Sequence, residues 1–217
     1  MFGIENYLGF MAASLLLNVT PGTDSMYIIT RSISQGSRAG FYSVLGITSG
    51  ILVHTVLAAL GLSILLANFP FAFMIVKYIG AIYLCYLGYK MMISKSESLL
   101  ANSLLEGKQP TRSKQLDHWK IYKQGVLTNV FNPKVALFFI AFFPHFIDAS
   151  YAYVTVTFLL LGLSFATTGL LWCSCLAFLA SVFSKNLREN PSIESILNKI
   201  GGMVFIGMGI KLLTEKV

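Results

Sequence analysis

Six long hydrophobic blocks separated by polar connections dominate the pattern of the chain. They cover residues 4–34, 39–67, 71–93, 119–147, 151–183 and 197–213. Each block can cross about 30 Å of hydrocarbon as a helix, and a spanning segment must satisfy its own backbone polar groups. The pattern therefore predicts an all-α membrane protein with six transmembrane helices. The first block has no Lys or Arg before Arg31, so it lacks the basic start of a cleaved signal peptide and we expect it to be retained.

The composition agrees with a membrane protein and excludes several other classes. Hydrophobic residues make up 55% of the 217 residues and charged residues only 12%, with a mean hydropathy of +0.71. Roughly a quarter of a soluble domain is charged, so a soluble enzyme and a disordered chain are excluded. Three cysteines, all inside hydrophobic blocks, do not make a disulfide scaffold and are interpreted as packing residues.

The net charge of +7 indicates membrane topology rather than nucleic-acid binding. Most of the sixteen Lys and Arg residues lie in the connections after the first, third and fifth blocks. By the positive-inside rule these connections are cytoplasmic, and both termini lie outside. The long polar segment 94–118 is then a cytoplasmic linker. If the first block is re-entrant instead of spanning, the N-terminus changes side.

Two pairs of similar motifs indicate an internal repeat. Ile79-Gly80, followed by Gly88 and Lys90, matches Ile200-Gly201, followed by Gly209 and Lys211. The first and fourth blocks share a Pro preceded by short polar residues, although the offset is 112 residues there and 121 in the other pair. The predicted domains are a first three-helix repeat, a linker and a second three-helix repeat, at residues 1–93, 94–118 and 119–217. Repeats with three spans each must be inverted, as in many secondary transporters.

The two prolines inside the blocks mark the predicted functional centre. Pro21 is followed by Gly22 and Pro133 is preceded by Asn132, so both helices are predicted to be broken there. A break frees carbonyl and amide groups that must face protein, water or ligand. Each restarted helix also presents a partial positive charge of roughly +0.5, which attracts a carboxylate.

Ionisable residues sit beside both breaks. Asp24 follows Pro21 by three residues and Lys134 directly follows Pro133, although charged residues are costly inside a membrane. Lys134 and the restarted helices are predicted to hold a carboxylate, and Asp24 an ammonium group or the coupling proton. The alternative is that Asp24 only caps its helix while Lys134 pairs with it or snorkels. The predicted substrate-binding residues are Asn18, Thr20, Pro21, Gly22, Thr23, Asp24, Asn129, Asn132, Pro133 and Lys134, with Asp24 also the proton-coupling residue.

Other features leave alternatives open. His54 in the second block is expected either to relay protons or only to pack against neighbouring helices. The glycines at 36, 40, 46 and 50 suit close helix packing within the chain or in a homodimer. No enzyme motif and no metal or cofactor site is found. An exporter of a divalent cation would want several oxygen or thiolate ligands, and a membrane thiol or electron carrier would want Cys beside the prolines.

These elements together resemble the LysE/RhtB family of bacterial amino-acid exporters. The resemblance rests on Thr20-Pro21-Gly22-Thr23-Asp24, on the segment from Arg31 to Gly40, on Gly46 to His54, on Lys77 to Gly88 and on Asn129 to Lys134. It implies efflux of amino acids or close derivatives across the inner membrane, driven by the proton-motive force, with lipid, substrate and protons as partners. Thr23 replaces the usual second Pro of the first motif, and Ile51 stands where many members carry Asp.

Overall fold

The computed structural model describes residues 2–62, 117–148 and 150–182, together with single helical residues between 71 and 93 and between 199 and 213. The predicted third and sixth blocks and the linker therefore fall wholly or largely outside the described residues. In the described part every regular element is a helix, as the hydrophobic pattern predicts. The elements are α1 (Tyr7–Val19), α2 (Thr23–Gln35), α3 (Ser37–Leu57), the π-helical η1 (Ala58–Leu62), α7 (His118–Val130), α8 (Pro133–Leu137), the π-helical η2 (Phe138–Phe142), the 3₁₀-helical η3 (Phe143–Phe146) and α9 (Val154–Val182).

Two described helices are long and apolar enough to cross a membrane without interruption. One is α3 continued by η1, with 26 residues, and the other is α9, with 29 residues. They correspond to the second and fifth hydrophobic blocks. Apolar side chains occur on all faces of both helices. This is expected for segments that face either protein or lipid on every side.

The first hydrophobic block folds as two helices. α1 and α2 have 13 residues each, or about 20 Å at 1.5 Å per residue, so neither alone crosses the hydrocarbon layer. Between them, Thr20 adopts an extended conformation and its hydroxyl donates to the Leu16 carbonyl at 2.6 Å. Gly22 is the N-cap of α2 and supplies no side-chain hydrogen bond, so the first amides of this helix have no cap.

The fourth block also folds in pieces. α7 ends at Val130 and α8 begins at Pro133, and the two segments meet at an angle of 47°. Pro suits the first position of a helix because its missing N–H is not needed there. Asn132 caps this start, since its Oδ1 accepts from the Lys134 amide at 3.0 Å. If the bent pair is one span, the described residues hold up to three candidate spans.

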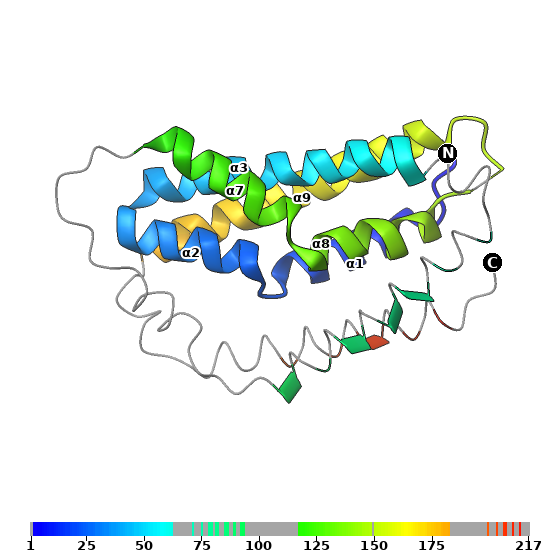
Figure 1. The fold of residues 1–217 in the computed structure, drawn as a ribbon, viewed down its shortest axis with the longest axis horizontal. Helices are drawn as coiled ribbons and strands as arrows, with labels where there is room; N and C mark the ends of the chain where they lie inside the picture. The colour runs from blue at the N-terminus through cyan, green and yellow to red at the C-terminus, as the bar shows by residue number, and fades with distance from the viewer. Residues whose placement is uncertain are drawn as a thin grey trace.

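The helices form a bundle with two uninterrupted and two interrupted members (Figure 1). α3 and α9 run along its length and pack on each other, while α1 and α2 follow one another along it. α3 makes its most extensive contact with α7, where Gly46 and Gly125 meet. A Cβ on Gly46 would collide with the Tyr122 carbonyl, so these two helices touch through their backbones.

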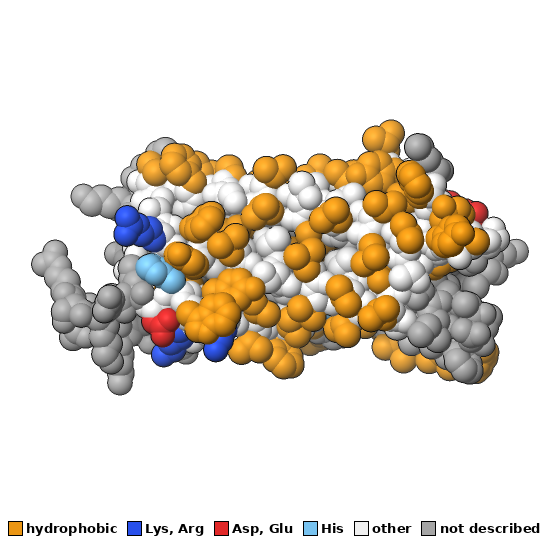
Figure 2. Space-filling view, turned by 90° about the horizontal axis from the view of Figure 1, so that it is seen from above, with side chains coloured by type: hydrophobic (Ala, Val, Ile, Leu, Met, Phe, Trp, Pro, Cys, Tyr) orange, Lys and Arg blue, Asp and Glu red, His pale blue; other side chains and the backbone are white. Residues whose placement is uncertain are grey.

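The interior is rich in aromatic side chains and the outside is apolar as well. Eight phenylalanines of the described residues are almost completely buried: Phe10, Phe138, Phe139, Phe142, Phe143, Phe146, Phe158 and Phe165. Figure 2 shows hydrophobic side chains along the length of one face, with Lys and Arg gathered at one end. Large apolar side chains such as Leu171 and Phe178 of α9 are about two-thirds exposed. A continuous apolar exterior of this kind fits a lipid environment.

The N-terminal segment closes the end of the bundle opposite Arg38. The Glu5 amide donates to the Phe146 carbonyl at 2.8 Å, and the Asp148 amide donates to the Gly3 carbonyl at 2.9 Å. In the adjoining loop, Ser150 donates to Asp148 Oδ1 through its hydroxyl and its amide. These hydrogen bonds lower the pKa of the exposed Asp148 carboxyl.

Candidate functional site

The two proline interruptions lie side by side in the bundle and free equivalent carbonyl groups. In a regular helix the carbonyl of one residue accepts from the amide four residues later. Proline has no N–H, so Pro21 frees the carbonyl of Leu17 and Pro133 frees that of Asn129. At membrane depth both carbonyls need another donor.

Lys134 supplies that donor at the first interruption. Its Nζ donates to the Leu17 carbonyl at 3.1 Å and to the Thr20 carbonyl at 2.9 Å. The Lys134 side chain is only 9% exposed, so it does not snorkel to the membrane surface. Gly22 allows this approach, because a Cβ there would lie 3.0 Å from Nζ. The cation of the second half thus binds backbone oxygen atoms of the first half.

His54 lies at the second interruption. Its Nε2 is 3.3 Å from the freed Asn129 carbonyl, which also accepts from the Asn132 amide at 2.9 Å. The imidazole is 8% exposed and stacks on the Phe139 ring, with 5.5 Å between the ring centroids. Since a carbonyl only accepts, the contact requires a proton on Nε2. His54 therefore completes the hydrogen bonding of the interrupted helix.

Asp24 lies in the first turn of α2 and is 8% exposed. Its Oδ2 accepts from Asn129 Nδ2 at 2.8 Å. Its Oδ1 is buried and receives no hydrogen bond from the described residues. An acidic side chain in the first helical turn interacts favourably with the helix dipole. One carboxylate oxygen of Asp24 is thus held by Asn129, and the other has no hydrogen-bond partner among the described residues.

Two buried asparagines add further unpaired atoms beside Asp24. Asn129 Oδ1 and Asn132 Nδ2 make no hydrogen bond within the described residues. The orientation of each amide is assigned from its other partner, which is the Asp24 carboxylate for Asn129 and the Lys134 amide for Asn132. The side chain of Asn132 also lies close to that of Asp24. Most buried polar groups in proteins are paired, so this concentration of unpaired atoms is unusual.

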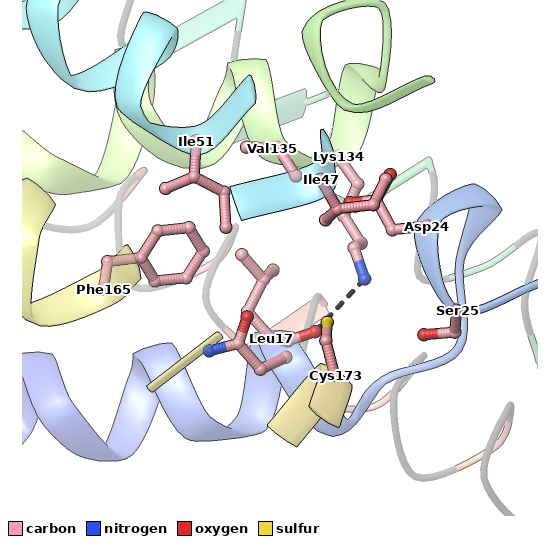
Figure 3. A pocket seen from close by; sticks show the side chains of 10 residues that line it. Leu17, Asp24, Ser25, Ile47, Ile51, Lys134, Val135, Phe165 and Cys173 are labelled. Carbon is pink, nitrogen blue, oxygen red and sulfur yellow. Dashed lines mark hydrogen bonds between the residues drawn. The ribbon is translucent and has the colours of Figure 1, made fainter. Parts of the chain in front are cut away.

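A small cavity separates the two charged side chains from an apolar wall (Figure 3). Its volume is about 20 Å³, and a water molecule needs roughly 10–15 Å³ measured in this way. The site is therefore closed around space for about one water. The lining residues are Leu17, Asn18, Asp24, Ser25, Ile47, Ile51, Lys134, Val135, Phe165 and Cys173.

The predicted site residues divide into those that meet at this centre and those that do not. Asp24, Lys134, Asn129, Asn132 and Thr20 are buried around it. Asn18 lines the cavity and donates to the Thr168 hydroxyl at 3.2 Å. The residues that shape the interruptions are Pro21 and Gly22, which are half-buried, and Thr23 and Pro133, whose side chains are exposed on the outside. Those of Thr23 and Pro133 therefore do not line the cavity.

Several lining residues carry no polar signal in the sequence. Phe165 and Cys173 come from α9, which has no charged residue. The only signal is spacing, because Phe165, Gly169, Cys173 and Ala177 recur every fourth residue and are all buried. Cys173 is thus part of the cavity wall as well as a packing residue, whereas Cys175 is exposed. Two residues apart on a helix, Cys173 and Cys175 lie on different faces of α9.

The ionisable side chains near the interruptions are few. Among the described residues there is no group of three or more His, Cys, Asp or Glu side chains able to hold a metal ion. Asp24 and His54 are the acidic and imidazole groups near the interruptions, and Lys134 is a cation.

Buried ionisable side chains at two helix interruptions, inside an apolar helical bundle, are typical of membrane transport proteins. The chain matches the model of the LysE type translocator family over residues 15–216. The match covers most of the chain, so the protein belongs to the LysE type translocator family. This places it among transport proteins.

Relatives of similar length support this assignment. The chain is 25% identical to a leucine efflux protein of Salmonella choleraesuis, covering 98% of this chain and 97% of the relative. It is 29% identical to the membrane protein YrhP of Bacillus subtilis, covering 96% and 98%. It is 30% identical to the membrane protein PA4757 of Pseudomonas aeruginosa, covering 98% and 96%. No solved structure matches the chain.

Proposed function

We propose that this protein exports amino acids or close derivatives across the bacterial inner membrane, by alternating access and in exchange for protons. The observation that carries the proposal is the group of unpaired buried atoms at the two interruptions: Asp24 Oδ1, Asn129 Oδ1 and Asn132 Nδ2. The family is one of translocators, and relatives that cover nearly the whole chain are named leucine efflux proteins.

The unpaired atoms match the two ends of an amino-acid zwitterion. Asp24 Oδ1 and Asn129 Oδ1 are acceptors, which an ammonium group satisfies. Asn132 Nδ2 is an unpaired donor, and Lys134 Nζ keeps a third donor besides the two that bind the Leu17 and Thr20 carbonyls; a carboxylate satisfies both. The uncapped amides at the start of α2 add partial positive charge nearby. A zwitterion bound here leaves neither of its charges unpaired.

Proton coupling follows from competition at Asp24. The carboxylate binds either the ammonium group of the cargo or a proton, and not both. Cargo release on one side of the membrane therefore favours protonation, and deprotonation on the other side restores the cargo site. This exclusion produces proton–amino acid antiport without a separate proton channel.

The inverted repeat is supported by two contacts of the same kind. Lys134, just after the second interruption, binds the Leu17 carbonyl just before the first. Asp24, just after the first interruption, accepts from Asn129 just before the second. Each contact joins a residue just after one interruption to a residue just before the other, as expected if the two halves are related by a two-fold axis.

Three further contacts agree with this relation. Asn129 packs on Gly50 of α3, where a Cβ would lie 2.6 Å from the Asn129 Cβ. Asn18 packs on Gly169 of α9, where a Cβ would lie 3.4 Å from the Asn18 Oδ1. The Cys85 thiol donates to the Ile206 carbonyl at 3.9 Å, and these residues are separated by the same 121 positions as the paired Ile-Gly motifs. Equivalent residues meet in this way on a two-fold axis.

Alternating access requires that the cavity open, since its present size of about 20 Å³ is far below the roughly 300 Å³ of the smallest ligand pockets. The homodimer suggested by the glycines of the second block stays a prediction, because Gly40, Gly46 and Gly50 all pack within this chain.

The test is transport by the purified protein in proteoliposomes. We expect wild-type protein to accumulate labelled neutral amino acids inside the vesicles when the lumen is acidic, because the outward flow of protons then drives the amino acids inward. Asp24→Asn keeps the shape of the side chain but does not ionise, so we expect gradient-driven accumulation to be lost. The matched control is Asp148→Asn in the exposed loop, which should behave as wild type. Full gradient-driven transport by Asp24→Asn would remove this residue from the coupling step, and a wild type inactive toward every amino acid would overturn the proposed function.

A further inference from the structure

Another cavity lies at the basic end of the bundle, away from the two interruptions. Its walls come from the first two turns of α3 and the first residue of α7, and its volume is about 480 Å³. Ligand sites commonly have volumes of roughly 300–1,000 Å³. Figure 2 shows basic side chains and a histidine beside hydrophobic ones at this end. The lining residues are Ser37, Arg38, Phe41, Tyr42 and His118.

The polar wall of this cavity offers positive charge and hydrogen-bond donors. Arg38 is exposed, and a guanidinium is always charged and binds a phosphate through two N–H groups. α3 begins here with Gly36 as its N-cap and without a side-chain cap, so the amides of its first turn add partial positive charge. Ser37 adds a hydroxyl, and His118 Nε2 has no hydrogen-bond partner among the described residues. Together these groups favour an anion.

The charges around the cavity do not cancel this preference. Lys120 and Lys123 follow within the first two turns of α7. Asp117 is the acidic residue beside them, and its Oδ1 accepts from the Lys120 amide at 3.0 Å, so this carboxylate serves as the cap of α7. Arg38 forms no ion pair with another described residue. The positive charge of Arg38 is therefore available to a ligand.

The remaining wall is aromatic and continues into the apolar outside of α3. Phe41 is 55% exposed, and the Tyr42 ring stacks on the His118 ring with 4.4 Å between the centroids. Phe41, Leu45 and Leu52 recur at helical spacing along one face of α3, and all three are at least partly exposed. An apolar track thus leads from the cavity along a helix that is long enough to cross the membrane. A small soluble anion would leave this track unused.

An exposed tryptophan indicates that the cavity lies at the level of the lipid head groups. Trp119 follows His118 and is 62% exposed. Lys123 Nζ lies 4.9 Å from the centroid of its ring. Tryptophan is enriched at membrane–water interfaces, and basic residues there face anionic head groups.

We propose that this cavity binds the phosphate group of an anionic phospholipid, whose acyl chains lie along the outer face of α3. Arg38 and the first turn of α3 hold the phosphate, and Phe41 contacts the beginning of the chains. Basic pockets between transmembrane helices suit such head groups. The positive-inside rule predicts that the lipid belongs to the cytoplasmic leaflet. This site does not involve the cargo, so the inference is independent of the proposed function.

The test is lipid binding by the purified protein in detergent. The midpoint of thermal unfolding is followed during titration with phosphatidylglycerol, and native mass spectrometry counts the bound lipids. A ligand that binds the folded state raises the midpoint, so we expect a saturable rise. Phosphatidylcholine carries an ammonium group beside its phosphate and should give no saturable rise. Inorganic phosphate, which has no acyl chains, should give none at the same concentration.

Substitutions locate the binding at the cavity. Arg38→Gln removes the charge at similar length, so the dissociation constant for phosphatidylglycerol should rise about tenfold, as expected for one lost hydrogen bond to a charged group. Lys120→Gln removes the same charge from an exposed residue outside the cavity and should change the constant less than about twofold. Arg38→Lys keeps the charge without the planar fork and should give an intermediate value.

Several outcomes would overturn the inference. They are equal stabilisation by phosphatidylcholine, unchanged binding in Arg38→Gln, and equal losses in Arg38→Gln and Lys120→Gln. Inorganic phosphate or an amino acid that stabilises the protein as well as the lipid does would assign the cavity to a soluble anion instead. If Arg38→Gln does not fold, His118→Gln and Phe41→Ala change the same cavity and must still weaken binding. Since no transport is measured, failure of this inference leaves the proposed function standing, and the reverse also holds.

Discussion

At the scale of single residues, proline determines where side chains must take over hydrogen bonds from the backbone. Pro21 and Pro133 each free the carbonyl four residues earlier, and these carbonyls are bound by Lys134 and by the Asn132 amide with His54. A lysine buried in an apolar bundle is costly unless its donors are used. Lys134 therefore has a structural task in the closed state as well as the proposed role in binding a carboxylate.

Lys134→Met should destabilise the protein. It keeps a side chain of similar length but leaves the Leu17 and Thr20 carbonyls without this donor, and an unsatisfied buried group costs about 1–3 kcal/mol. We expect a lower midpoint of thermal unfolding in detergent. The control is Lys120→Met, because Lys120 is exposed at the start of α7 and should leave the midpoint unchanged. Equal midpoints for Lys134→Met and the wild type would mean that the two carbonyls find other donors.

At the scale of the elements, the uninterrupted helices hold the interrupted ones through small residues. α3 meets α7 at Gly46 and Gly125, and it meets Asn129 at Gly50. α9 meets α3 at Gly162, where a Cβ would collide with the Thr55 side chain. Close approach of backbones increases van der Waals contact, which drives helix association where the hydrophobic effect is absent. These contacts position the two interruptions beside each other.

Gly46→Ala should therefore weaken the bundle, while Gly61→Ala should not. A methyl group at Gly46 collides with the backbone of α7, and overpacking of this kind costs about 1–3 kcal/mol. At Gly61 in η1 no atom lies within 4 Å of the added Cβ, so the same change should be neutral. Thermal unfolding in detergent and the yield of folded protein measure both effects. Similar losses in the two variants would contradict the proposed backbone contact between α3 and α7.

At the scale of the whole molecule, the bundle has two chemically different ends. Arg38 and His118 lie together at one end, close to the start of both α3 and α7. The N-terminal segment and the loop at Ser150 form the other end. The positive-inside rule predicts that the first end is cytoplasmic.

Labelling of single cysteines tests this orientation. In a variant with Cys85, Cys173 and Cys175 changed to Ala, we introduce Ser150→Cys or Ser37→Cys, both at exposed positions. A membrane-impermeant maleimide should label Ser150→Cys from outside the inner membrane and Ser37→Cys only after permeabilisation. The opposite pattern would reverse the orientation. Labelling of both from one side would contradict a spanning bundle.

The sequence by itself determined the kind of protein and the positions of the helix interruptions. Hydrophobic blocks of spanning length predict a helical membrane protein, because lipid offers no partner to an open backbone, and family membership agrees with the motifs around Pro21 and Pro133. It also singles out Asp24 and Lys134, since charges are rare in such blocks. These features are local, and a local pattern is enough to recognise them.

Only the tertiary structure decided which groups satisfy one another. The partners of Lys134 lie 114 and 117 residues away, and Asn129 lies 105 residues from Asp24. His54, Ile51 and Phe165 enter the site from long apolar helices whose sequence does not distinguish a cavity wall from a lipid face. Thr23 and Pro133 belong to the motifs but face outward. Burial depends on which helices pack together, and helix packing joins residues that no local pattern connects.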